Sequence, residues 1–592
     1  MRAQQLITEH IDLWTSTIKA KKNQGRGSNK KRELYGIKKL RELILELAVR
    51  GKLVPQDPND EPASVLLERI AAEKVQLIKD KKIKKQKPLP KIADEEKLFD
   101  LPDGWEWSRL GDLCDTKTGY AFKSRQYVDE GTFVLRVTNI ESNGKIIKAD
   151  NKYIDSLSAN GEFNKFLLNP DDILLVMVGG SLGKIGVVSI NDLPAVLNQN
   201  MWRFVRFGGV EKNYFIHGLK LINSSQITIT KSTHGHLSQG DYLRKLFPLP
   251  PEKEQHRIVA KVDELMALCD QLEQQTESSL DAHKLLVDTL LSTLTDAHDA
   301  KELSDNWARI ANHFDTLITT DYAVEQLKQT ILQLAVMGKL VPQDPNDEPA
   351  SELLKRIAAE KEQLVKDKKI KKQKALPEIT NEDKPFELPE GWELARFKDI
   401  ATYIQRGKGP KYAESGSVQV ISQKCIQWTG FDLERARYIE DSSLENYQEE
   451  RFLRSKDLLW NSTGTGTVGR INILDNIPEK TLVADSHVTV IRSIMMNVGF
   501  LQTYISAPGV QSRIEPRHEK ALVSGSTKQV ELNTSSVNSL PIPIPSIEEQ
   551  HRIVAKVDEL MTLCDQLKAQ LNNAQTTQLD LSDAVVENAL TA

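Results

Sequence analysis

The peptide "KLVPQDPNDEPAS" occurs at residues 52–64 and again, letter for letter, at 339–351. Its prolines are expected to end a helix, because proline lacks a backbone donor and its ring clashes with the preceding turn. Asp60 and Ser64 then provide side chains suited to starting the next helix. The peptide therefore marks the end of one helix and the start of the next. Its second copy indicates that the chain contains the same structural unit twice.

The repeat extends well beyond this peptide. The segment "LYGIKKLRELILELAVRGKLVPQ" (34–56) corresponds to "DYAVEQLKQTILQLAVMGKLVPQ" (321–343), and "LPDGWE" (101–106) corresponds to "LPEGWE" (388–393). A further block, "EQHRIVAKVDELM", begins at Glu254 and at Glu549. The first blocks recur after 287 positions and the last after 295, so the termini fall at nearly the same point of the repeat. We predict two circularly permuted copies related by a pseudo-two-fold axis, with both chain ends jointly rebuilding what the middle supplies.

The repeated blocks have the apolar spacing of coiled-coil helices, alternating between four and three residues. One pair of equivalent seams comprises Ile258, Val262, Leu265, Cys269 and Leu272, and Ile553, Val557, Leu560, Cys564 and Leu567; the partner seams comprise Ile37, Leu40, Ile44 and Leu47, and Val324, Leu327, Ile331 and Leu334. Ordinary amphipathic helices without a long supercoil are the alternative. A heptad helix of about 23 residues spans roughly 35 Å, so a helical pair is suited to hold two domains at a fixed distance.

Between the repeated blocks lie two regions with a shared pattern but few shared letters. β-Rich runs such as "DDILLVMVG" and "DLLWNST" are bounded by Gly, Asn and Asp, which indicates mixed α/β domains with short strands. We therefore predict an α+β fold in which two such domains are separated by long antiparallel coiled-coil helices. The predicted boundaries are 1–100 (N-terminal helices), 101–250 (first variable domain), 251–387 (central helices), 388–546 (second variable domain) and 547–592 (a C-terminal helix that pairs with the N-terminal region).

Composition and motifs exclude several function classes. The 592 residues carry a net charge of -4, contain no apolar run of membrane-spanning length and begin without a signal-peptide pattern, so a cytoplasmic protein is expected. The four cysteines form no CxxC pair, which argues against structural zinc or a disulfide framework. "GTGTVG" (464–469) precedes a strand-like run instead of a helix, and "GGSLGKI" lacks the required P-loop residues. Both glycine stretches favour tight hairpins that bring the backbone and short polar side chains close to a ligand.

Taken together, the duplicated "LAVRGKLVPQ", two "LP(D/E)GWE" domain starts, two "P(E/S)xEQHRIV" exits and two dissimilar central regions resemble the specificity subunits of Type I restriction-modification enzymes. The resemblance covers essentially the whole chain. It implies that each variable region is a target recognition domain that reads one half of a split, asymmetric site in double-stranded DNA. The helices would set the spacing and dock two methyltransferase subunits, and restriction subunits would join that core.

The resemblance also implies that this chain is not itself an enzyme. Catalytic residues and the cofactors S-adenosylmethionine, ATP and Mg would belong to the partner subunits, and no catalytic, cofactor or metal residues are assigned here. A structural adaptor or antirestriction decoy without sequence preference is the alternative. Divergent domains beside nearly identical connectors favour the recognition subunit, because a mere scaffold gives no reason to vary two domains while keeping their connectors constant.

Candidate DNA contacts are polar residues at strand ends and in Gly-rich loops, where Arg or Lys suits guanine, Asn or Gln suits adenine, and backbone amides suit phosphate. In the first domain they are Lys117, Tyr120, Lys123, Arg125, Thr138, Asn139, Ser181, Lys184, Asn198, Gln199, Asn200, His234 and His236. In the second they are Arg406, Lys408, Lys411, Tyr412, Gln423, Lys424, Thr465, Thr467, Arg470, Ser486, His487, Lys528 and Gln529. For each one, an exposed loop residue without a DNA contact is the competing interpretation.

The most basic run, "KDKKIKKQK", occurs in both copies, at 79–87 and 366–374. Two interpretations stay open from the sequence. The lysines contact phosphates or a partner, or they form the solvated face of a helix.

Overall fold

The computed structural model describes residues 3–20, 32–141, 143–227, 237–464, 466–526 and 529–591. Two compact units divide the chain: the first contains Met1–Ser278 together with Gln575–Ala592, and the second contains Ser279–Ala574. The first unit is thus built from both ends of the chain, which confirms the circular permutation inferred from the repeat. The five predicted domain boundaries stay a prediction.

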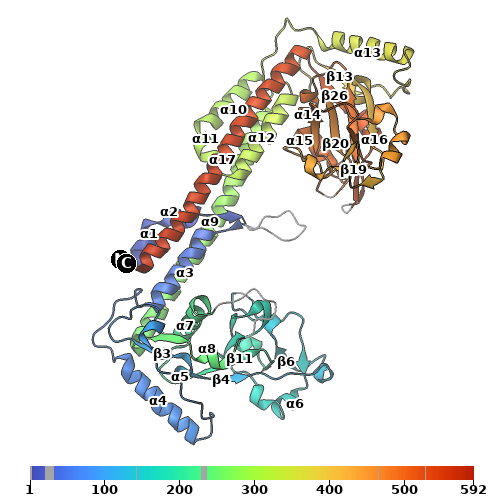
Figure 1. Ribbon diagram of the computed structural model, residues 1–592. Helices are drawn as coiled ribbons and strands as arrows, with labels where there is room; N and C mark the ends of the chain where they lie inside the picture. The colour runs from blue at the N-terminus through green and yellow to red at the C-terminus, as the bar shows by residue number, and fades with distance from the viewer. Residues whose placement is uncertain are drawn as a thin grey trace. The chain divides into compact units, whose positions relative to one another are not determined.

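In the first unit, helices form a bundle to which a mixed domain is attached (Figure 1). Its helices are α1 (Ala3–Glu9), α2 (Ile11–Ser16), α3 (Tyr35–Val49), α4 (Ala63–Lys79), α5 (Leu110–Leu113), α6 (Ser156–Asn160), α7 (Lys212–Ser225), α8 (Gln239–Leu243), the first part of α9 (Glu252–Asp296) and the end of α17 (Ile547–Thr591). α3 runs antiparallel to α9, since Arg41 pairs with Asp270 at 2.6 Å while Gln56, beyond the end of α3, donates to Glu254 near the start of α9. The end of α17 covers α3, where Tyr35 donates to Asp583 at 2.9 Å.

The second unit repeats this bundle. Its helices are the last part of α9, α10 (Ala300–Asn312), α11 (Phe314–Leu317), α12 (Asp321–Val336), α13 (Ala350–Lys366), α14 (Val498–Ser506), α15 (Pro508–Gln511), α16 (Thr534–Ser539) and the first part of α17. α12 takes the place of α3, and Tyr322 donates to Asp288 at 2.7 Å as Tyr35 does to Asp583. The predicted antiparallel helical pairs are therefore confirmed in each unit.

All the residues of the seam on α9 and of the two partner seams are buried, as the heptad pattern predicts. The helix length differs from the expectation. α9 and α17 each contain 45 residues, about 67 Å at 1.5 Å per residue, instead of a segment of about 23 residues. Helical hydrogen bonding continues where the apolar pattern weakens, because neighbouring segments still cover one side of each helix.

The variable domain of the first unit contains two four-stranded sheets, with strand orders β4-β11-β8-β9 and β10-β6-β7-β5, and the pair β12-β3. The strands are β3 (Glu106–Arg109), β4 (Cys114–Thr118), β5 (Tyr127–Val128), β6 (Thr132–Leu135), β7 (Tyr153–Ile154), β8 (Ile173–Val176), β9 (Ile185–Val187), β10 (Ala195–Leu197), β11 (Met201–Arg206) and β12 (Leu246–Leu249), with β1 (Lys19–Ala20) and β2 (Arg32–Glu33) outside the domain. β6 and β10 are parallel, and the first sheet is antiparallel.

The variable domain of the second unit has the same strand order: β14-β23-β20-β21, β22-β16-β19-β15 and β26-β13. Its strands are β13 (Glu393–Arg396), β14 (Ala401–Arg406), β15 (Tyr412–Ala413), β16 (Gln419–Ile421), β17 (Ile426–Gln427), β18 (Gly430–Phe431), β19 (Arg437–Ile439), β20 (Asp457–Asn461), β21 (Ile471–Leu474), β22 (Leu482–Ala484), β23 (Val488–Ser493), β24 (Val523–Ser526), β25 (Gln529–Leu532) and β26 (Pro541–Ile544). Two regions with few letters in common therefore share one topology.

Only the first lysine of each basic run belongs to a helix, so the interpretation of the runs as a helix face is wrong. α4 ends at Lys79 and α13 at Lys366. Lys81 and Lys368 then adopt a left-handed backbone conformation, with φ of 59° and 56°, which terminates each helix. The remaining lysines of both runs follow in non-helical backbone.

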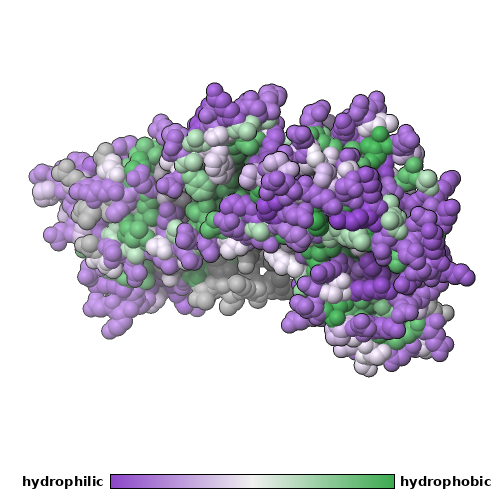
Figure 2. Space-filling model, turned by 90° about the horizontal axis from the view of Figure 1, so that it is seen from above, coloured by the Kyte–Doolittle hydropathy of each residue, from purple (hydrophilic) through white to green (hydrophobic). Residues whose placement is uncertain are grey.

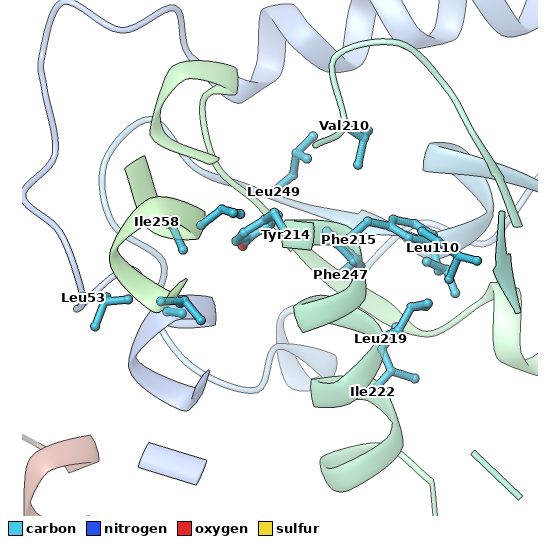
Figure 3. Packing of buried hydrophobic residues seen from close by; sticks show 14 of the residues in the cluster. Leu53, Leu110, Val210, Tyr214, Phe215, Leu219, Ile222, Phe247, Leu249 and Ile258 are labelled. Atoms are coloured by element: carbon cyan, nitrogen blue, oxygen red, sulfur yellow. The ribbon is translucent and has the colours of Figure 1, made fainter. Parts of the chain in front are cut away.

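The three most similar sequence blocks meet at one place in each unit, which we call the joint. In the first unit, the Trp105 indole donates to Glu254 at 3.0 Å and Arg257 pairs with Asp60 at 2.6 Å. Gly51 packs so closely on this site that an added Cβ would lie 2.3 Å from Pro102. In Figure 3, residues from α7, β12 and the start of α9 pack side by side near Leu53.

The joint of the second unit uses the equivalent residues. Trp392 donates to Glu549 at 3.0 Å, and Arg552 pairs with Asp347 at 2.6 Å. A Cβ on Gly338 would lie 2.6 Å from Pro389. The repeated motifs are thus similar because together they attach each variable domain to its helices.

The buried glutamates make the joints sensitive to pH. Burial raises the pKa of Glu254, and this outweighs the hydrogen bonds from Trp105 and Gln56, which lower it. A carboxyl group with a raised folded-state pKa stabilises most when protonated and loses that contribution as pH rises from about 4.3 through the raised value. We expect Glu254→Gln to lose less thermal stability than the wild type across this interval, as measured by melting curves at stepped pH. If the difference in melting temperature between Glu254→Gln and the wild type did not change with pH, desolvation of the carboxylate would be contradicted.

The four cysteines are free and buried. Burial raises the pKa of Cys269 to about 11 and also raises that of Cys564, its counterpart in the second seam. Since the thiolate is the nucleophile, we expect no alkylation by iodoacetamide at pH 8 in the native protein and four modified thiols in denaturant, counted by intact-mass spectrometry. Rapid native labelling of Cys269 would mean that the helical seam opens.

Candidate nucleic-acid interface

In the first unit, loops from both four-stranded sheets meet beyond the carboxyl ends of β4, β6, β8 and β10. We call this set loop face 1 (117–125, 136–141, 143–147, 177–184 and 198–200). The Tyr120 amide donates to the Leu197 carbonyl at 3.0 Å, and the Gln199 amide donates to the Tyr120 carbonyl at 2.9 Å. The Asn198 amide donates to the Leu135 carbonyl at 3.1 Å, which joins the loops after β6 and β10. Backbone hydrogen bonds therefore fix the loops to one another.

The structure gathers most candidates of the first domain on this face. Lys117, Lys123, Arg125, Thr138 and Gln199 are exposed, whereas Tyr120, Ser181, Lys184, Asn198 and Asn200 are half-buried. Lys117 also lines an open pocket of about 500 Å³ together with Lys165, Asn164 and Asn169. The Tyr120 ring packs on Phe122 and Phe163, with ring centroids 5.0 and 4.9 Å away. These contacts stabilise the loop that contains Tyr120.

Asn139 has a structural position instead of an exposed one. It is 0% exposed, and its amide group donates to the carbonyls of Ile147 and Ala149 at 3.0 Å each. Its side-chain oxygen accepts from the Arg136 amide at 2.9 Å. All of its polar atoms thus hold the loop after β6, and we leave Asn139 out of the proposed DNA contacts.

The second unit builds an equivalent loop face 2 (406–412, 422–430, 462–464, 466–470 and 485–487). The Thr463 hydroxyl lies 2.7 Å from Nδ1 of His487, and the Ser462 amide donates to the His487 carbonyl at 2.8 Å. Thr467 donates to Oε1 of Gln423 at 3.2 Å. Arg470 donates to Gln427 at 2.6 Å. Loops that follow four different strands therefore share one polar surface.

Most candidates of the second domain lie on loop face 2. Lys411, Tyr412, Lys424 and His487 are exposed, and Lys408, Gln423, Thr467, Arg470 and Ser486 are half-buried. Arg406 differs, because it pairs with Glu531 and donates to the Leu532 carbonyl, so part of its charge is compensated inside the domain. The stretch at 464–469 does lie in a hairpin, since β20 and β21 pair antiparallel and Gly464, Gly466 and Gly469 between them have positive φ, but the connection 462–470 is longer than the tight turn that was predicted.

Five candidates cannot be placed. His234, His236, Thr465 and Lys528 lie outside the described residues, and only the backbone of Gln529 is described, in β25.

Thr463, Gln427 and Trp428 belong to loop face 2 but were not among the sequence candidates. Thr463 is the last residue of the strand-like run "DLLWNST", and Gln427 and Trp428 lie in "KCIQWTG", where a tryptophan stands among polar and turn residues. Trp428 is 54% exposed in the turn between β17 and β18. An aromatic residue in a polar loop was the available signal, because exposed rings stack on bases.

Both loop faces offer donors and acceptors on a rigid support, which suits hydrogen bonding to base edges and phosphates. Hydrophilic residues also cover much of the surface seen in Figure 2. Across the described ranges, no group of three or more His, Cys, Asp or Glu residues is arranged to hold a metal ion. None of the described helices combines the length and apolarity needed to cross a membrane.

Comparison with known proteins agrees with this architecture. The family model described as "Type I restriction modification DNA specificity domain" matches residues 102–282 and 389–575, so each match contains one variable domain and the start of the following long helix. These two domains define the class of protein. The chain belongs to the family of Type I restriction enzyme specificity subunits.

Individual relatives support this assignment along the full length. The chain is 39% identical over 606 residues to the EcoEI specificity subunit and 40% identical over 611 residues to the EcoAI specificity subunit, both from Escherichia coli and both with 100% of each chain covered.

Among solved structures, the HsdS subunit from Thermoanaerobacter tengcongensis matches with a TM-score of 0.41 and 17% identity, covering 84% of this chain and 98% of that one.

Proposed function

We propose that this chain is the DNA-recognition subunit of a Type I restriction-modification complex, in which each variable domain reads one half of a split, asymmetric site. One observation carries the proposal. The two variable domains have the same strand order and are attached to their helices through equivalent joints, but their loop residues differ. Identical supports present different side chains, which suits two unrelated half-sites. Full-length relatives named as specificity subunits support the same function.

The partners follow from the family. The helical bundles dock two methyltransferase subunits, and restriction subunits join the complex for DNA cleavage. S-adenosylmethionine, ATP and Mg are bound by those partner subunits. This chain determines which DNA sequence is recognised and how far apart its two halves lie. The recognition role needs no catalytic group in this chain.

Mapping adenine methylation tests the proposal. The chain is co-expressed with its neighbouring methyltransferase subunit, and the host genome is read by long-read sequencing, with the methyltransferase subunit alone as control. We expect a motif with two unrelated half-sites separated by a fixed spacer. A stable complex without any motif would support the adaptor or decoy instead.

A double variant tests which half-site the second variable domain reads. Gln423→Ala combined with His487→Ala changes only loop face 2, so we expect relaxed or lost discrimination in one half-site while the other half-site is unchanged. Equal effects on both halves would contradict independent recognition by the two domains.

A further inference from the structure

The lysine runs form two exposed surfaces outside the residues of the loop faces. We call residues 80–90 strap 1 and residues 367–377 strap 2. Strap 1 carries five exposed lysines and one aspartate; the lysines are Lys81, Lys82, Lys84, Lys85 and Lys87. Strap 2 carries the equivalent exposed set of Lys368, Lys369, Lys371, Lys372 and Lys374, again with one aspartate. Each strap therefore presents a strong local positive charge on a chain whose net charge is -4.

Strap 1 is attached to the recognition domain at several points. Ile83 packs against the core of the unit, and Gln86 donates to Asp115 at 3.2 Å. Leu89 covers Gly111, where an added Cβ would lie 3.1 Å from the leucine. Arg109 donates to the carbonyl of Pro90 at 3.2 Å. Anchoring residues recur at every third position, so the lysines between them point away from the domain.

Strap 2 is held through backbone carbonyl groups in and next to it. Lys398 donates to the Lys374 carbonyl, and Arg396 donates to the Glu378 carbonyl just beyond the strap. In the described part of the chain, the ion pairs of the strap lysines are local: Lys82 with Asp80 at 3.8 Å and Lys369 with Asp367 at 3.7 Å. Both pairs are exposed and contribute little, so most of the charge remains uncompensated.

Strap 1 lies beside loop face 1. Gln86 contacts Asp115 near the start of β4, and loop face 1 begins two residues further along this strand, at Lys117. The two residues from Asp115 to Lys117 span about 7 Å of backbone. The lysine run itself extends about 20 Å if it is nearly extended. A duplex that is read by loop face 1 is therefore close enough for its flanking phosphates to reach strap 1.

The composition of the straps indicates the kind of partner. Both straps have the same lysines although the loop faces differ, so the partner is the same at both units and is independent of base sequence. Protein interfaces are depleted in lysine and enriched in aromatic residues and arginine, and these runs contain neither. Phosphates on duplex DNA suit a row of mobile point charges.

We propose that the two lysine straps bind the sugar-phosphate backbone of DNA outside the recognised half-sites, without sequence preference. The proposal extends the proposed function by a second class of DNA contact. The strap contacts strengthen binding to every duplex by a similar factor, so the loop faces alone select the sequence.

Charge-removing variants test the straps in the assembled complex with the methyltransferase subunit. All five lysines of one strap, or all ten of both, are replaced by glutamine, and matched variants carry arginine instead. Binding to a duplex with the mapped site and to a scrambled duplex of the same length is measured by fluorescence anisotropy over a series of salt concentrations. Because the lysines are exposed, melting temperatures are expected to stay within error of the wild type.

For the ten-glutamine variant we expect the slope of log K against log salt to become shallower by about 2 to 4, since each phosphate contact contributes about 0.9. Affinity for both duplexes falls about 10- to 100-fold at low salt, their ratio is unchanged, and the arginine variants bind like the wild type. An unchanged slope overturns the proposal, and loss of the complex on size-exclusion chromatography would assign the straps to a protein partner. If the wild type fails to discriminate the two duplexes, recognition itself is refuted, whereas the slope still tests the straps.

Discussion

Trp105→Ala is expected to destabilise the first unit by about 3 to 5 kcal/mol, the usual cost of removing a buried aromatic side chain. Trp105 is 5% exposed, its ring meets Tyr214 edge to face with centroids 6.2 Å apart, and its indole is a donor to the buried Glu254. Alanine leaves a cavity and removes one of the hydrogen bonds to that carboxylate. Both effects act where the variable domain joins the helices, so the domain is expected to loosen from its support.

Hydrogen exchange measured peptide by peptide provides the readout. About 1.4 kcal/mol corresponds to a factor of ten in opening, so protection in β3 and β12 is expected to fall by about two to three and a half orders of magnitude. The joint around Trp392 in the second unit is unchanged and serves as an internal control. Trp307→Ala, which alters a tryptophan that is 45% exposed, is the matched variant with little expected effect. Equal loss of protection in both units would contradict a local joint.

The helical seams and the repeat were predictable from the sequence because both depend on local spacing. Ile258, Val262 and Leu265 repeat at intervals that fix one helix face, and the structure buries all three. The shared topology of the variable domains was predictable for a similar reason, since alternating apolar runs survive the loss of identical letters. Helix length was less predictable, because α9 continues beyond its clearest heptads.

The joint and the loop faces depend on contacts between distant segments, which spacing does not reveal. Nothing local in "DGWEW" indicates that Trp105 meets Glu254, although the duplication of both motifs identified them as important. Asn139 shows the same difficulty at the site. A polar residue after a strand suits a DNA contact, yet here its amide group is used by the loop itself. Only the folded loop distinguishes the two roles.

Gly119→Ala is expected to abolish recognition by the first domain while leaving the second domain intact. A Cβ at position 119 would lie 1.9 Å from the carbonyl oxygen of Asn198, a backbone atom that cannot move without disturbing the loop after β10. Gly407 has the same role in the second domain, where an added Cβ would lie 2.1 Å from the Ala484 carbonyl oxygen. Glycine is required at both positions because two loops cross there in backbone contact.

Methylation mapping with each variant separates the two halves. Since a methyl group at this crossing displaces the loops that carry the recognition residues, we expect Gly119→Ala to reduce methylation at the mapped site at least 100-fold, and any remaining methylation to lose sequence preference in one half only. Gly407→Ala is expected to affect the other half. Gly240→Ala is the matched control, because its Cβ would meet nothing within 4 Å. Loss of preference in the same half for both variants would refute the assignment of one half-site to each loop face, since the two crossings belong to different domains.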